Sequence, residues 1–278
     1  MKISIFSLFR DSGKHLERLF RQLEKVEQQT NAQLEYFFYE NDSIDNTPKL
    51  LEEWISTRKG ILLSEKLGSK KFGSTLDRER MILLSNARNK MKNLDNDSDS
   101  TFSLIFDSDI IFDGSLVNNF LKHKDLDFSM LTANVRQDVP CKMGSGKDSS
   151  YYDSSILFDT EGNNCMTWSN NPFYEDEDRE NFENNNPVEV SRAFGSAAFC
   201  RTKAFKKCQW NSSGESEHWS FCDQIREYGK IFLLPDVKVY VNIPQKNWEH
   251  ENSVIEYQNN MLESPWNRFI VKASRNNH

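Results

Sequence analysis

Two carboxylates, one residue apart, lie in an apolar run near the middle of the chain. The run extends over residues 101–112 and contains Asp107 and Asp109, which Ser108 separates. A continuous apolar run of this kind is typical of a buried strand. Paired carboxylates at its end repel each other unless a cation or hydrogen bonds compensate their charge. Mn²⁺ or Mg²⁺, bound also to a substrate phosphate, would provide that compensation. An ordinary acidic turn without a ligand is the alternative.

The residues before this run predict elements that bring other polar groups to the same place. Strands are expected at residues 3–9, 34–39 and 60–64, and amphipathic helices at 15–28, 47–54 and 76–92. Alternation of strands and helices predicts a mostly parallel sheet with right-handed crossovers. Because ligands of such sheets bind beyond the carboxyl ends of the strands, the residues that follow each strand are the candidates for binding.

Polar residues follow the first two predicted strands as well. Arg10 follows the first strand, and Asn41 and Asp42 follow the second. We expect these strand ends to form a nucleotide pocket with the Asp-Ser-Asp turn, in which Asn41 or Asp42 binds the base or the ribose. An Asx-rich turn with no ligand is the competing interpretation of residues 40–45.

Composition narrows the classes of protein that the chain can represent. It has 278 residues, 37% hydrophobic and 28% charged, which indicates a globular protein. The net charge of −7 argues against nucleic acid as a partner. No apolar segment approaches the roughly 18 residues of a membrane span, so we expect no transmembrane segment, with peripheral membrane contact left open. The five cysteines show no Cys-x-x-Cys spacing, which favours reduced thiols and a cytoplasmic location.

The second half of the chain is less regular. Residues 137–190 are polar and acidic, and we expect a long elaborated loop region with exposed aromatic side chains that either stack on sugars or pack over the sheet edge. These aromatic residues are Tyr151, Tyr152, Trp168, Phe173 and Tyr174. A glycine-containing strand is expected within 188–201, a helix at 214–229, and two strands at 230–235 and 237–241.

Several motifs occur together in a particular order. They are Arg10-Asp11, the turn at 39–47, Arg80 with Asn86-Ala-Arg-Asn89, Phe106-Asp-Ser-Asp109, Phe194-Gly-Ser-Ala197, and Gly214-Glu-Ser-Glu-His218. In this order they resemble a GT-A type nucleotide-sugar glycosyltransferase, and the chain is also similar to the fungal capsule-associated mannosyltransferase group and to some viral glycosyltransferases.

The resemblance implies a fold and a domain plan. The fold would be α/β, with a Rossmann-like, mostly parallel central sheet flanked by helices and an elaborated insert on the acceptor side. Residues 1–245 would form one domain, with a nucleotide-binding half at 1–113 and an acceptor half at 114–245. Residues 246–278 would form a tail that packs back on it.

The resemblance also implies roles for the residues that match the motifs. Asp107 would lie near the ribose or the metal, and Asp109 would bind Mn²⁺ or Mg²⁺ directly. Glu217 matches the acidic motif that deprotonates the acceptor hydroxyl in inverting enzymes, and Glu215 is its rival, although helix capping explains either residue. The group expected to bind the nucleotide or its phosphates comprises Arg10, Asn41, Asp42, Arg80, Arg88, Asp107 and Ser108.

Two histidines and the stereochemistry stay open at this point. His250 would supply a third metal ligand, and His218 replaces the aspartate of the usual Glu-Asp motif, so the base itself is in question. Because a retaining enzyme needs no such base, both stereochemical outcomes remain possible.

The leading hypothesis is therefore a metal-dependent glycosyltransferase. Its donor would be a UDP- or GDP-linked sugar and its acceptor a hydroxyl of a glycan, lipid or protein. The alternatives are a nucleotidyltransferase, which would require a glycine-rich loop after the first strand, and a non-catalytic carbohydrate-binding protein on the same fold.

Overall fold

The computed structural model describes residues 1–72, 77–96, 99–140, 147–165, 170–212 and 216–241. Residues 1–241 belong to one compact unit. The predicted tail lies outside the described residues, and the division into a nucleotide-binding half and an acceptor half stays a prediction.

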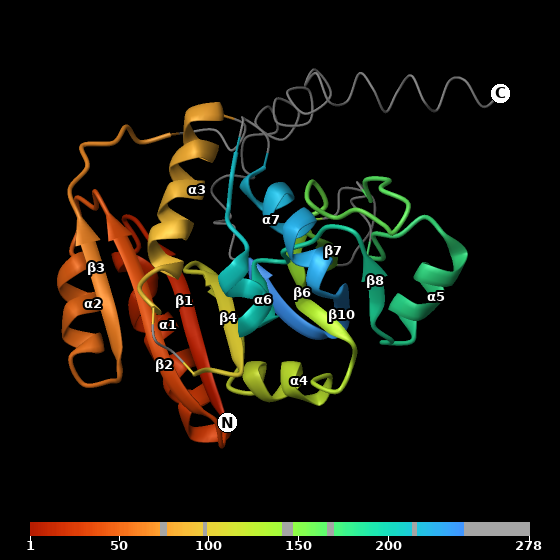
Figure 1. Ribbon diagram of the computed structural model, residues 1–278, viewed down its shortest axis with the longest axis horizontal. Helices are drawn as coiled ribbons and strands as arrows, with labels where there is room; N and C mark the ends of the chain where they lie inside the picture. Colours follow the sequence, from red (N-terminus) through yellow and green to blue (C-terminus); the bar gives the residue numbers. More distant parts are fainter. Residues whose placement is uncertain (73–76, 97–98, 141–146, 166–169, 213–215, 242–278) are drawn as a thin grey trace. The chain divides into compact units, whose positions relative to one another are not determined.

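The first half of the chain alternates strands and helices as the pattern predicts (Figure 1). Its elements are β1 (Lys2–Phe9), α1 (Gly13–Gln29), β2 (Gln33–Asn41), α2 (Thr47–Ile55), β3 (Gly60–Glu65), α3 (Arg78–Lys92) and β4 (Phe102–Asp107). The strands pair in the order β3-β2-β1-β4, and each of these pairs is parallel. The ends of these strands therefore meet at one edge of the sheet.

The second half extends the same sheet with mixed strand directions. Its elements are β5 (Ile110–Ile111), α4 (Leu116–Lys122), β6 (Phe128–Pro140), β7 (Lys147–Tyr151), α5 (Asp176–Glu183), β8 (Val188–Val190), β9 (Ala197–Arg201), α6 (Thr202–Lys207), α7 (Glu217–Ile225), the short 3₁₀ helix η1 (Arg226–Tyr228) and β10 (Lys230–Val241). β9 lies antiparallel between β4 and β6, and β6 pairs in parallel with β10. Together the strands form a ten-stranded sheet.

Alternating side chains anchor helices on both faces of the sheet. Phe38 of β2 contacts Trp54 of α2 on one face, with ring centroids 5.7 Å apart. Phe6 of β1 contacts Phe205 of α6 on the other face, with centroids 5.1 Å apart. Because successive residues of a strand point to opposite faces, aromatic runs in β1 and β2 support both layers. Figure 1 shows α3 crossing the sheet on the side opposite to α1 and α2.

The prediction for residues 137–190 is wrong in two respects. The segment contains β7, α5 and β8 rather than loop alone. Tyr151 and Phe173, which were predicted to be exposed, are each 1% exposed, whereas Tyr152 and Tyr174 are exposed. Trp168 lies outside the described residues. The segment builds its core against β6 and within itself, as the contact of Phe173 with Phe182 shows.

The last two predicted strands are a single strand, β10. Its register against β6 shifts between Leu234 and Lys238, so the proline and its neighbours form an irregularity inside one strand. This is a position where a strand tolerates proline, which cannot donate a ladder hydrogen bond.

Candidate active site

The Asp-Ser-Asp turn lies at the predicted position beyond the sheet edge. Asp107 is the last residue of β4, and its backbone N–H donates to the carbonyl of Ser196, at 3.0 Å. The hydroxyl of Ser108 lies 3.3 Å from that of Ser12, which follows β1. The structure thus brings the turn against the end of the neighbouring parallel strand, as the topology requires.

Asp109 is an exposed carboxylate at this turn. Its backbone carbonyl accepts a hydrogen bond from Arg18 Nη2, at 2.9 Å, but its side chain makes no ion pair with any residue that the structure describes. Reduced solvation and the neighbouring Asp107 raise the pKa of the Asp109 carboxyl. Two carboxylates this close in the sequence form a site where a cation would be stabilised.

Arg88 connects this turn to α7. Its Nη2 donates to Asp107 Oδ1 at 3.2 Å and to Glu217 Oε1 at 3.4 Å, and its guanidinium lies 5.0 Å from the centre of the Phe194 ring. The Arg88 residue is only 5% exposed. Arg88 is therefore buried and paired with Asp107 at the Asp-Ser-Asp turn, and its contact with a donor phosphate stays a prediction.

Glu217 begins α7 and is itself 6% exposed. Besides Arg88 it faces His218, whose Nε2 lies 3.4 Å from Glu217 Oε1. The His218 ring stacks on Phe194 with centroids 3.9 Å apart. Burial and the charge of Arg88 hold the pKa of His218 well below its usual range, so the ring is neutral at pH 7.

Asp153 is a site residue that the sequence did not indicate. It follows β7, and its Oδ2 accepts a hydrogen bond from the backbone N–H of Gly195, at 3.2 Å. Burial, together with the charges of Asp107 and Glu217, raises the pKa of the Asp153 carboxyl to about 7. A lone aspartate in a polar segment carries no spacing signal, so only the folded chain brings it to this place.

The predicted nucleotide-binding residues on the other side of the edge converge on one loop. Arg10 donates to the carbonyl of Ser69 at 2.8 Å and to that of Lys70 at 3.2 Å. Asn41 Nδ2 donates to Asp42 Oδ2 at 3.0 Å and to Ser69 Oγ at 3.2 Å. These three strand-end residues therefore hold the segment that follows β3.

The Asp42 carboxylate is fully engaged in this arrangement. Its oxygens accept hydrogen bonds from the backbone N–H groups of Leu67 (2.7 Å), Gly68 (2.8 Å) and Ser69 (3.0 Å), and also from the Ser69 hydroxyl and Asn41. Burial alone would raise the pKa of Asp42, but the hydrogen bonds from Ser69 and Asn41 outweigh it and hold that pKa well below its usual range. Asp42 shapes the loop, and its contact with a nucleotide stays a prediction.

The remaining predicted residues are less constrained. Arg80 lies in the first turn of α3, is partly exposed and makes no ion pair or hydrogen bond within the described part of the chain. Glu215 and His250 lie outside the described residues.

The donor set near Asp107 and Asp109 fits a hard divalent cation. Within the described ranges no group of three or more His, Cys, Asp or Glu side chains is arranged to hold a metal ion. Mg²⁺ and similar ions at phosphate sites need only one or two protein carboxylates, because phosphate oxygens and water complete the shell. The two aspartates match that requirement.

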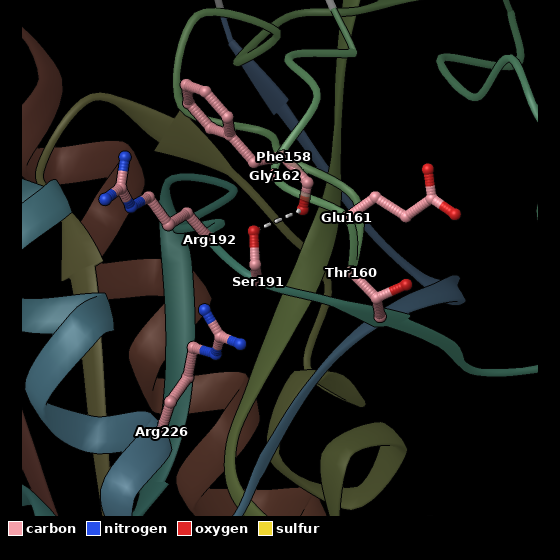
Figure 2. Close-up of a pocket in the computed structure, with 7 residues that line it drawn as sticks. All are labelled: Phe158, Thr160, Glu161, Gly162, Ser191, Arg192 and Arg226. Carbon is pink, nitrogen blue, oxygen red and sulfur yellow. Dashed lines mark hydrogen bonds between the residues drawn. The ribbon is translucent and has the colours of Figure 1, made fainter.

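A cavity of about 220 Å³ lies elsewhere in the second half of the sequence (Figure 2). Its lining comprises Phe158, Thr160, Glu161, Gly162, Ser191, Arg192 and Arg226. None of the predicted site residues lines it, and Arg192 is already paired with Asp223 through two hydrogen bonds of 2.8 Å. Figure 2 shows the two arginine side chains on one side of this cavity and Glu161 on the other.

The parallel β3-β2-β1-β4 sheet, the antiparallel β9 and the acidic turn after β4 give the chain a GT-A type fold. Residues 2–226 match the model of the family described as cryptococcal mannosyltransferase 1, and the chain belongs to that family. A comparison with curated proteins gave no match.

Solved structures support the fold. The chain is similar to S. aureus TarS 1-349, with 17% identity and a TM-score of 0.51 over 90% of this chain and 63% of that one. It is also similar to the mannosyltransferase PcManGT from Pyrobaculum calidifontis, solved with GDP-Man and Mn²⁺, with 13% identity and a TM-score of 0.51 over 88% of this chain and 58% of that one. The chain thus spans less than two thirds of each of these proteins.

Among the residues that the structure describes, no helix is long and apolar enough to cross a bilayer.

Proposed function

We propose that the protein transfers a sugar from a UDP- or GDP-linked donor to a hydroxyl of a glycan, lipid or protein, with the help of Mn²⁺ or Mg²⁺. The observation that carries the proposal is the position of Asp107 and Asp109, at the end of β4 and beside the end of β1. Membership of a mannosyltransferase family supports it, and so does the likeness to PcManGT, whose structure contains GDP-Man and Mn²⁺.

In this proposal the residues beyond β4 and the residues beyond β2 have different roles. Asp109 and Asp107 would hold the cation, which when bound stabilises the negative charge that develops on the departing nucleoside diphosphate. Arg88 fixes the Asp107 carboxylate, and the loop that Asp42 organises would border the nucleotide. Arg80, which has a guanidinium free of protein partners in the described chain, is available to a phosphate. Glu217 and Glu215 stay predictions for the base.

A thermal-shift screen tests the proposal. The protein is heated with UDP- and GDP-linked sugars, each with and without Mn²⁺. A donor that binds the folded state raises the melting temperature by mass action, and we expect this rise only when Mn²⁺ is present. A carbohydrate-binding protein without transferase activity would respond to neither nucleotide nor Mn²⁺, and that result would contradict the proposal.

Hydrolysis of the donor provides the second readout. Wild-type protein with Mn²⁺ should release nucleoside diphosphate from the donor that gave the largest shift. Release of pyrophosphate from a nucleoside triphosphate and a sugar phosphate would instead support a nucleotidyltransferase.

A further inference from the structure

Asp153 has no role in the function proposed above, but the hydrogen bonding of its carboxylate points to one. Gly195 donates to its Oδ2 at 3.2 Å, and among the described residues no other hydrogen bond to this side chain is present. Asp153 is partly exposed. One carboxylate oxygen is thus fixed by the backbone, and the other, Oδ1, is free to meet a ligand.

The turn at Gly195 and Ser196 holds Asp153 near Asp107. Gly195 and Ser196 both have left-handed backbone angles, with φ of 61° and 53°. Gly195 binds Asp153, and the carbonyl of Ser196 accepts the backbone N–H of Asp107 at 3.0 Å. A Cβ on residue 195 would lie 2.2 Å from the carbonyl oxygen of Ala133, so the turn requires glycine. Consecutive residues of one rigid turn therefore position Asp153 and Asp107.

Glu217, the base suggested by the motif, is placed differently. Its Oε1 is 3.4 Å from Arg88 Nη2 and 3.4 Å from His218 Nε2. Only 6% of the residue is exposed. A carboxylate held inward by a buried arginine is well suited to orient that arginine and poorly placed to reach an incoming hydroxyl.

We propose that Asp153 is a catalytic residue, whose free Oδ1 accepts the proton of the hydroxyl that attacks the donor sugar, while Glu217 positions Arg88. The inference rests on the proposed glycosyl transfer. The hydroxyl oxygen forms a bond to the anomeric carbon, and the bond from that carbon to the phosphate oxygen breaks. Its electron pair stays on the nucleoside diphosphate, and the hydroxyl proton passes to Asp153.

The electrostatic surroundings suit this role. Burial raises the pKa of Asp153 to about 7 with the help of the charges of Asp107 and Glu217, and against the hydrogen bond from Gly195 and the charge of Arg88. A cation bound to Asp107 would offset part of this rise. A general base is most effective when its pKa lies near the working pH, because it then combines availability with basicity.

The test compares variants of the full chain with Mn²⁺ and the donor selected by the thermal-shift screen. Water and a set of methyl glycosides serve as acceptors. Asp153→Asn keeps the shape of the side chain and removes the base, and Asp153→Ala opens space for added formate. The matched control is Asp223→Asn, which removes an exposed carboxylate of α7 that pairs outward with Arg192.

We expect Asp153→Asn to lower kcat by about 100-fold or more, with the Kd for Mn²⁺ and nucleoside diphosphate unchanged. Added formate should partly restore the rate of Asp153→Ala, which a merely structural role would not allow. Asp223→Asn should keep the wild-type rate. A rate for Asp153→Asn within tenfold of wild type would overturn the inference, and so would a loss of nucleotide binding in that variant.

Failure of the proposed function would look different. A wild-type protein that binds no nucleotide with Mn²⁺, or that binds a donor and transfers its sugar to neither water nor glycosides, contradicts the transfer reaction itself. Wild-type transfer combined with an active Asp153→Asn contradicts only the role of Asp153.

Discussion

The carboxylates on the two sides of the sheet edge differ in how their negative charge is compensated. Beyond β2, the single carboxylate of Asp42 accepts hydrogen bonds from three backbone N–H groups and two side chains. Beyond β4, Asp107 and Glu217 share one guanidinium, that of Arg88. Asp109 forms no ion pair with the described side chains, and the charges of Arg18 and Lys14 do not outweigh the causes that raise its pKa. The pKa values follow this difference, because the pKa of Asp42 is lowered and those of Asp109 and Asp153 are raised.

The difference distinguishes a carboxylate that stabilises the fold from carboxylates that could take part in a reaction. A carboxylate whose hydrogen bonds are complete stabilises the folded chain by itself, and it needs no ligand. Carboxylates that lack compensation lower stability until a cation or a proton arrives, and such imbalance is typical of functional sites. In the proposed function the β2 side would therefore border the nucleotide, and the β4 side is where a metal ion and a reacting hydroxyl would bind.

Of the substitutions considered, removal of Arg88 should lower the free energy of unfolding most. Arg88→Ala leaves Glu217 buried without its cation, and we expect a loss of about 3 kcal/mol or more in the free energy of unfolding. Urea denaturation at pH 7 measures this loss. Arg78→Ala on the exposed first turn of the same helix is the control, with an expected change within about 0.5 kcal/mol. A similar small change for Arg88→Ala would show that the buried ion pairs are not formed.

Asp42→Asn tests the β2 side, where the carboxylate has its full set of hydrogen bonds. The substitution removes the charge that several N–H groups share, and we expect it to cost about 1–2 kcal/mol at pH 7. Because the pKa of Asp42 is lowered by folding, its contribution is present above the unfolded value of 3.8 and is lost as the pH falls toward the folded pKa. The wild type and Asp42→Asn should therefore converge in stability at acid pH. A difference that is independent of pH would contradict the assignment.

Asp153→Asn should raise the free energy of unfolding of the metal-free protein, whereas Asp42→Asn should lower it. Folding raises the pKa of Asp153 from 3.8 to about 7. The folded state therefore binds the proton more tightly, and wild-type stability falls as the pH rises through that interval. We expect Asp153→Asn to be more stable than wild type at pH 8 by about 1 kcal/mol, or about 2–4 °C in Tm. The gap should narrow at pH 5, and a gap that widens there would show that Asp153 is not destabilised by its charge.

Local pattern was enough to predict the first half of the fold. β1, β2 and β4 are largely apolar stretches, with polar residues at or directly after their ends, and the helices between them carry their own periodicity. Parallel topology then placed Asp107 and Ser108 beside the end of β1 without any knowledge of side-chain contacts.

Long-range contacts account for what could not be predicted. Asp153 becomes part of the site through Gly195, which is 42 positions away in the sequence. The backbone N–H groups that donate to Asp42 come from residues 67–69, whose sequence does not indicate where they fold. The burial of Tyr151 depends on a hairpin with β6, where Tyr151 pairs with Arg136. In each case the decisive partner is distant in the chain, so no local pattern reveals it.

Calorimetric titration of Mn²⁺ with nucleoside diphosphate into the wild type and Asp109→Asn tests the central claim most directly. The substitution keeps the size of an exposed side chain and removes a charge that forms no ion pair with the described residues, so the fold should persist, as the melting temperature will show. We predict that wild-type protein binds the nucleotide in a Mn²⁺-dependent manner and that Asp109→Asn loses about 100-fold or more of this affinity. Equal Mn²⁺-dependent affinity in the two proteins would contradict the account.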